Sequence, residues 1–118
     1  MEKTPATKER RRNTRTWLNR SGRIRIESGR ESYMQVVDLS QRGAALYCST
    51  ELEPGTDVEV KFHLNMNPET IWLTMRGRVE RSYARGDSHL VRILFVEPKL
   101  EALETILEYI TYKSQRNR

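Results

Sequence analysis

Cysteine, histidine and long apolar runs are scarce in this chain of 118 residues. Cys48 is the only cysteine, so an internal disulfide and a multi-cysteine zinc site are excluded, and a reducing compartment is expected. No apolar run approaches the about 20 residues of a membrane span. The opening residues, Met1 to Pro5, have no apolar segment behind them, so we predict no secretory signal and a cytoplasmic location.

The parts of common catalytic sites are missing as well. Neither His63 nor His89 has a serine or cysteine at a spacing that would deliver a nucleophile, and two isolated histidines make a weak metal site. No phosphate-binding Gly-x-x-x-x-Gly-Lys loop is present. Three glutamates fall on one face of a predicted helix, where charges are usually solvated: Glu101, Glu104 and Glu108. We therefore expect a binding protein rather than an enzyme, with no cofactor and no metal.

The chain does have a basic segment at its beginning. Its net charge is +5, and residues 1–20 hold seven basic and two acidic side chains, while residues 21–118 hold fourteen of each sign. A basic segment ahead of a charge-balanced body is typical of contact with phosphate or an anionic membrane surface, although a solubilising tail has the same composition. We predict that residues 1–9 are disordered and that residues 10–20 form an arm that orders with ligand.

Short runs of alternating apolar and polar residues fill residues 21–96. The predicted strands begin at Gly22 and near residues 32, 44, 57, 71 and 89, with turns at Ser28-Gly29-Arg30, Glu53-Pro54-Gly55 and Arg85-Gly86-Asp87. The clearest alternation belongs to Val58, Val60, Phe62 and Leu64. The last strand is apolar at nearly every position and is predicted to be central. Because closure removes exposed edges in a short chain, we predict an all-β, six-stranded antiparallel barrel.

The apolar period changes beyond Pro98. It becomes helical and predicts an amphipathic helix over 98–113, with a frayed tail at 114–118 and an apolar stripe of Leu100, Leu103, Ile106, Leu107 and Ile110. This stripe must be buried, either across an open end of the barrel or against another copy of the chain. Capping of its own barrel is favoured, and the chain is expected to be a monomer or a weak homodimer.

Two polar motifs indicate the ligand. Arg11 and Arg15 form an Arg-x-x-x-Arg pair, and guanidinium groups meet phosphate oxygens or the guanine O6 and N7 atoms in pairs. In the second motif, Asp38-Leu39-Ser40-Gln41-Arg42-Gly43, a carboxylate can accept the guanine N1 and N2 hydrogens, while a serine hydroxyl and a glycine amide can serve a phosphate or ribose oxygen. A plain turn explains this hexapeptide alone equally well. Together the motifs predict an anionic ligand.

With both motifs in this order, residues 10 to 111 resemble the PilZ domain, the bacterial receptor module for cyclic di-GMP. The resemblance implies a PilZ domain over 10–113, composed of the arm at 10–20, a six-stranded barrel at 21–96 and a C-terminal helix. It also implies a ligand held by Arg10, Arg11, Arg15, Asp38, Ser40 and Gly43. In this family a basic residue at the position of Arg10 goes with an intercalated pair of ligand molecules. Arg92 departs from the family pattern, because many members have glycine near that point.

The resemblance implies a receptor or adaptor without catalytic activity, in which ligand orders the arm and changes the surface offered to an effector protein. The alternative is a small basic barrel that binds single-stranded nucleic acid through the arm and Trp17, Trp72 and Tyr83. The balanced charge of residues 21–118 argues against it, and we expect Trp17 to pack beneath the arm and Trp72 in the barrel wall. A PilZ-like adaptor that has lost the nucleotide is disfavoured because both motifs are complete.

Overall fold

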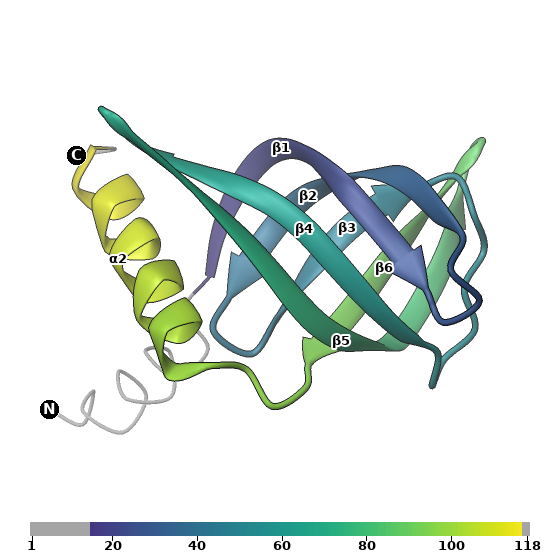
Figure 1. Cartoon of the computed structure of the whole chain (residues 1–118). Helices are drawn as coiled ribbons and strands as arrows, with labels where there is room; N and C mark the ends of the chain where they lie inside the picture. The colour runs from purple at the N-terminus through teal and green to yellow at the C-terminus, as the bar shows by residue number, and fades with distance from the viewer. Residues whose placement is uncertain (1–14, 117–118) are drawn as a thin grey trace, which may run out of the picture.

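Six antiparallel strands close into a ring in the computed structural model, which describes residues 15–116 (Figure 1). The elements are β1 (Arg15–Ile26), β2 (Glu31–Ser40), β3 (Gly43–Cys48), β4 (Asp57–Met66), β5 (Glu69–Arg85), β6 (Ser88–Phe95) and α2 (Leu100–Arg116). Each strand pairs with two neighbours, and the order around the ring is β1-β2-β3-β6-β5-β4. The predicted all-β barrel with a C-terminal helix is therefore confirmed.

The core fills the inside of the ring because the strands alternate as their sequences predict. In β4 the inward residues are all buried: Val58, Val60, Phe62 and Leu64. Cys48 is buried in β3, as expected, and its thiol donates to the Thr50 carbonyl oxygen at 3.2 Å. Burial raises the pKa of this thiol, which keeps it protonated and unreactive at neutral pH.

Strand β1 begins earlier than the sequence predicts. Residues 15–20 belong to the strand and pair with β2, whereas we expected an arm that ends where the strand starts at Gly22. Burial alternates regularly over residues 16–24, but the inward positions include Thr16, Arg20 and Gly22, so the sequence shows no apolar face that would reveal the strand. The second polar motif is also mostly strand, since only residues 41 and 42 lie between β2 and β3. The predicted tail at 1–9 and arm residues 10–14 lie outside the described residues.

Helix α2 closes one end of the barrel (Figure 1). It packs on β1, β2 and β4 and adds Ile106, Tyr109 and Ile110 to the core, so the expected cap is confirmed. The predicted apolar stripe was too wide, because Leu100 is 69% and Leu107 46% exposed. A helix laid across the end of a barrel buries only the side chains along its line of contact. Within residues 15–116, no helix is both long enough and apolar enough to cross a membrane.

Three outward side chains contradict the sequence predictions. Trp17 is 71% exposed and Trp72 is 61% exposed, so neither packs as expected. Leu94 of β6 is 41% exposed, and β6 is not a central strand, because a closed ring has none. The physical reason is the same for Trp72 and Leu94: each follows an inward neighbour in an alternating strand and therefore points outward.

Candidate ligand-binding site

The register of the ring brings the two motifs together. Strand pairing places Arg15 opposite Ser40 and Trp17 opposite Asp38, so the end of the arginine motif lies along the strand that carries the second motif. The side chain of Arg15 is not described, and Arg10 and Arg11 lie outside the described residues. The first residues of β1, which directly follow the arginine cluster, nevertheless run beside Asp38.

A row of side chains crosses the outer face of the barrel at this level. Residues directly opposite one another on paired strands point to the same face. Following the pairs from β1 across β2, β3 and β6 to β5 gives Trp17, Asp38, Ala45, Arg92 and Arg81. Ala45 lies between two core residues of β3, which confirms that this row points away from the core.

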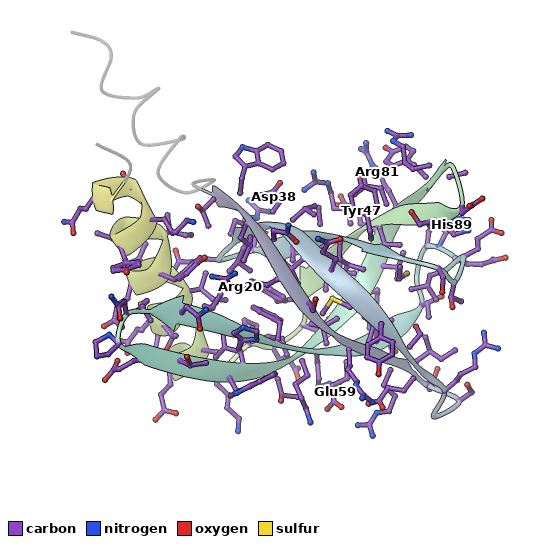
Figure 2. All side chains as sticks on the ribbon, turned by 90° about the horizontal axis from the view of Figure 1, so that it is seen from above. Arg20, Asp38, Tyr47, Glu59, Arg81 and His89 are labelled. Carbon is purple, nitrogen blue, oxygen red and sulfur yellow. The ribbon has the colours of Figure 1, made fainter. Side chains whose placement is uncertain are left out.

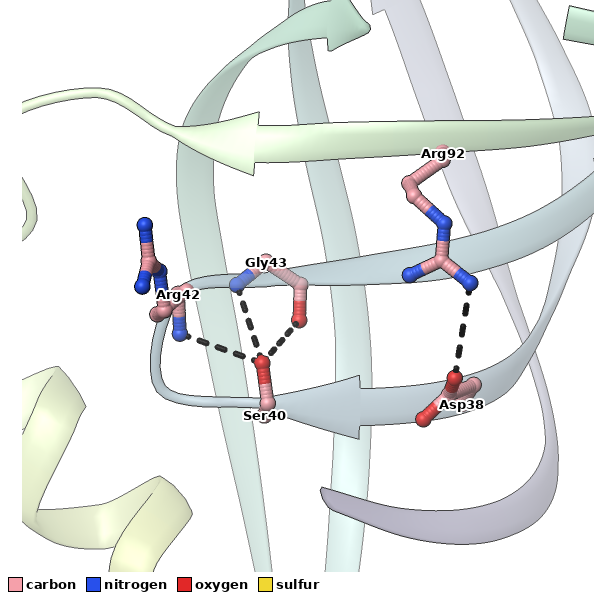
Figure 3. A network of polar contacts seen from close by, with 5 residues as sticks. All are labelled: Asp38, Ser40, Arg42, Gly43 and Arg92. Carbon is pink, nitrogen blue, oxygen red and sulfur yellow. Dashed lines mark hydrogen bonds and ion pairs between the residues drawn. The ribbon is translucent and has the colours of Figure 1, made fainter. Parts of the chain in front are cut away.

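Asp38 and Arg92 form an ion pair in the middle of this row (Figure 3). Arg92 Nη2 lies 3.9 Å from Asp38 Oδ2, and Arg92 reaches across Ala45, whose methyl group leaves the path open. Asp38 is only 3% exposed, which makes it the one buried charged or polar residue of the described chain. Because a buried carboxylate is costly without nearby cations or donors, the guanidinium of Arg92 stabilises Asp38 in this place.

Ser40 holds the turn that follows Asp38. Its Oγ accepts hydrogen bonds from the amides of Arg42 at 3.2 Å and Gly43 at 3.3 Å, and its hydroxyl lies 3.4 Å from the Gly43 carbonyl oxygen (Figure 3). Gly43 is required by packing, since a Cβ there would lie 2.0 Å from the Ile93 carbonyl oxygen. Both residues therefore shape the site as well as being candidates for ligand contact.

The face continues on both sides of this turn. A small pocket beside it is lined by Ser40, Arg42, Glu80, Arg92 and Leu94, among others. Farther along the row, Arg81 donates to the Tyr83 hydroxyl at 3.2 Å, and this contact raises the pKa of Arg81 above its ordinary value. Figure 2 shows Arg81 and Asp38 on the same side of the barrel. The described part of this face thus presents the guanidinium groups of Arg42, Arg81 and Arg92 around the buried carboxylate of Asp38, with the exposed carboxylate of Glu80 beside them.

The site also contacts the helix that caps the barrel. Gln41 Nε2, in the turn of the second motif, donates to the Leu103 carbonyl oxygen of α2 at 3.2 Å. Arg20 of β1 lies beside Tyr109, where burial raises the pKa of the phenol and the charge of Arg20 opposes that rise. The two strands that carry the motifs, β1 and β2, are therefore both in contact with α2 beside the site.

Sequence reasoning did not place Trp17 in the cyclic di-GMP site and gave Arg92 no role in ligand binding. Both enter the site through strand pairing, which a single sequence does not display. The inward positions around Trp17 include Thr16 and Arg20, so no apolar alternation marks Trp17 as outward. The only signal was proximity in the chain, since Trp17 is two residues from Arg15. Among residues 15–116, no group of three or more His, Cys, Asp or Glu side chains is placed to hold a metal ion.

Fold and site together define a small β-barrel domain, with an arginine-rich segment leading to an outer face built around a buried carboxylate. The chain belongs to the PilZ domain family, whose model matches residues 9–112. The predicted family is thereby confirmed.

Solved structures agree in fold. The inhibitor of motility MotI/DgrA from Bacillus subtilis matches with a TM-score of 0.78 at 16% identity, over 88% of this chain and 51% of that one. YcgR from Escherichia coli, in complex with c-di-GMP, matches with a TM-score of 0.71 at 15% identity, over 88% and 46%. The PilZ domain of YcgR with c-di-GMP gives 0.67 at 12% identity, over 88% and 91%.

The chain thus spans about half the length of the MotI/DgrA chain and of the longer YcgR chain that it matches. At these identities the likeness shows a shared fold. No curated protein sequence matches the chain.

Proposed function

We propose that this PilZ domain is a receptor for cyclic di-GMP and has no catalytic activity of its own. The observation that carries the proposal is the strand pairing that sets Arg15 opposite Ser40 and Trp17 opposite Asp38. It brings the end of an arginine cluster to a buried carboxylate on one outer face. Support comes from the family and from the shared fold with YcgR, whose structures contain c-di-GMP.

Each site residue has a role that suits its chemistry. Arg11 and Arg15 grip phosphate and guanine, Asp38 accepts the guanine N1 and N2 hydrogens, and Ser40 and Gly43 seat the sugar-phosphate. Charge-assisted hydrogen bonds contribute roughly 1.5–3 kcal/mol each, so several of them support micromolar binding at about 8 kcal/mol after the cost of ordering. Trp17 adds an exposed ring beside Asp38 on which a base stacks, worth roughly 1–3 kcal/mol.

Ligand binding fixes the arginine-rich segment against the barrel, and the altered surface is read by an effector protein in the bacterial cytoplasm. Arg10, the basic residue before the motif, favours two intercalated ligand molecules per chain. The functional unit runs from residue 10 to residue 113, with residues 10–14 as the part that responds to ligand.

Calorimetric titration with cyclic di-GMP, GTP and a short oligonucleotide tests this proposal. We expect selective binding of cyclic di-GMP, at two molecules per chain. Arg11→Ala, Arg15→Ala and Asp38→Asn should each weaken it by about tenfold or more, because each removes a charge-assisted contact. Asp38→Asn is preferred to alanine, since it keeps the volume of a side chain that is only 3% exposed.

Arg25→Ala is the matched control. It removes the same charge from an arginine that pairs with Glu59 on the other side of the barrel, and it should leave the affinity unchanged. Wild-type affinity in Asp38→Asn would refute the assignment of the site, and a ratio of one ligand per chain would refute the intercalated pair.

Single-stranded nucleic acid remains the alternative, favoured by the exposure of Trp17 and Trp72. Against it, three arginines on the outside of β1 and β5 are neutralised: Arg23 pairs with Glu31, Arg25 with Glu59 and Arg78 with Asp57. A nucleic-acid track needs unpaired cations along the phosphate path. Tighter binding of the oligonucleotide than of cyclic di-GMP would select this alternative.

A further inference from the structure

A furrow with aromatic walls lies on the wall of the barrel opposite the ligand-binding site. It is centred on β1 and β4, which stand across the ring from β3 and β6. Figure 2 shows the same separation, with Glu59 of β4 and Asp38 on opposite sides. Its volume of about 430 Å³ falls within the range of small ligand sites, roughly 300–1,000 Å³. Nothing in the proposed cyclic di-GMP site uses these residues.

Two exposed rings flank the furrow. Tyr33 of β2 is 76% exposed and Trp72 of β5 is 61% exposed. Both rings are held in place, because the Arg23 guanidinium lies 4.9 Å from the centre of the Tyr33 ring and His63 packs on Trp72 with ring centres 4.8 Å apart. Between the rings, the lining consists of Ser21 and Gly22 together with the side chains of Arg23, Lys61 and His63. Large aromatic rings left in water and fixed by neighbours are typical of binding hot spots.

Of the two basic side chains in the furrow, Arg23 has an acidic partner and Lys61 has none in the described part of the chain. Arg23 is paired with Glu31, with 3.0 Å between Nη1 and Oε1. Lys61 stands next to Arg23 in the strand register, and no acidic partner is within ion-pair distance of it among residues 15–116. A ligand that complements this furrow therefore brings a negative charge to Lys61.

The closed ring limits how a partner can bind here. β1 at residues 22–26 is hydrogen-bonded to β2 on one side and β4 on the other, so no edge is open to an added strand. The two rings are separated by charged and small residues, which gives no continuous apolar groove for a helix. Nucleic acid needs several unpaired cations, and the furrow offers only Lys61.

The remaining mode of peptide recognition is the binding of a polyproline II segment, and the furrow is suited to it. Such segments have no internal hydrogen bonds, dock between aromatic ridges, and need donors for their free carbonyl groups. The Tyr33 hydroxyl, the Trp72 indole N–H and the His63 ring can supply donors on both sides. We propose that the furrow binds a proline-containing, acidic segment of a partner protein in the polyproline II conformation.

Fluorescence anisotropy with two labelled synthetic peptides of equal length tests this proposal on the full chain. One peptide repeats Pro-Pro-Glu and the other Pro-Pro-Lys. We expect the acidic peptide to bind more tightly, and Lys61→Glu to reverse this preference. Tyr33→Ala and Trp72→Ala should each weaken binding of the acidic peptide by about tenfold or more, since truncation of an aromatic anchor commonly costs at least that.

Tyr83→Ala is the control, because it removes a 41% exposed ring outside the furrow and should leave peptide binding unchanged. An unchanged midpoint of thermal unfolding confirms that each variant is folded, whatever the fate of the cyclic di-GMP proposal. Failure of the acidic peptide to bind, equal binding of both peptides, or full binding by Trp72→Ala would overturn the proposal. So would Trp72-dependent binding of an oligothymidine, or Trp72-dependent dimerisation in sedimentation velocity, which would assign the furrow to nucleic acid or to a second copy.

Discussion

Gly43 has a packing role that is separate from any contact with ligand. The backbone of β6 passes so close that a Cβ on Gly43 would lie 2.0 Å from the Ile93 carbonyl oxygen. Backbone atoms in a closed barrel cannot move aside without loss of ladder hydrogen bonds. The fold therefore requires glycine at position 43, whether or not this residue also contacts the ligand.

Gly43→Ala should lower the free energy of unfolding by roughly 1–3 kcal/mol or more, because the added methyl group meets a carbonyl oxygen. Urea unfolding followed by circular dichroism measures the change. Gly77→Ala is the control: its Cβ would lie 3.1 Å from Ile93 Cδ1 and from the Leu94 carbonyl oxygen, which calls for a much smaller adjustment. Equal losses in the two variants would contradict the assigned cause.

The sequence could predict Asp38, Ser40 and Gly43 as a set because the three lie within six residues of one another. It could not predict that Arg92 reaches Asp38, because that contact depends on β3 and β6 pairing so that Ala45 lies between them. The exposure of Trp17 was predicted wrongly for another reason. Trp17 is at an outward position of β1, but Thr16 and Arg20 occupy inward positions beside it, so the local pattern shows no apolar face opposite the tryptophan.

At the scale of elements, alternation identified the strands with one clearly apolar face and was less informative elsewhere. β4 was predicted almost residue for residue because its inward positions are all large and apolar. β1 was shortened to its second half, because Leu18 is the only large apolar side chain at an inward position of residues 16–20. For α2 the apolar periodicity predicted which face of the helix is buried but not how wide the buried face is, because that width is set by the shape of the barrel end.

The narrow contact of α2 predicts different costs for two neighbouring residues. Ile106 is fully buried, so Ile106→Ala should lower the free energy of unfolding by roughly 2–5 kcal/mol through lost burial and a cavity. Leu107 is 46% exposed, and Leu107→Ala should change the free energy of unfolding by no more than about 1 kcal/mol. Chemical unfolding of the two variants measures the difference, and a larger effect at Leu107 would indicate that this side chain is buried in solution, as in a dimer.

At the scale of the whole molecule, the binding face, the ring and the helix form one cooperative unit. The ring is closed, α2 contributes three residues to the same core, and Gln41 ties the turn of the second motif to the Leu103 carbonyl oxygen. A domain of this size with a single core is expected to unfold in one step. Energy gained at the ligand site should therefore protect parts of the chain that never touch the ligand.

Hydrogen exchange can measure this coupling. With cyclic di-GMP at about 100 times its dissociation constant, each bound molecule stabilises the folded state by about 2.7 kcal/mol, so exchange through global unfolding slows about 100-fold for each molecule that the chain binds. The amides around Ile106 in α2 should slow by the same factor as those around Val36 in β2, because both segments open only when the whole core does. In Asp38→Asn the same concentration of ligand should produce no comparable slowing in either segment. Protection confined to β2 would mean that α2 opens separately, and the helix would then be a detachable cap rather than part of the unit that responds to ligand.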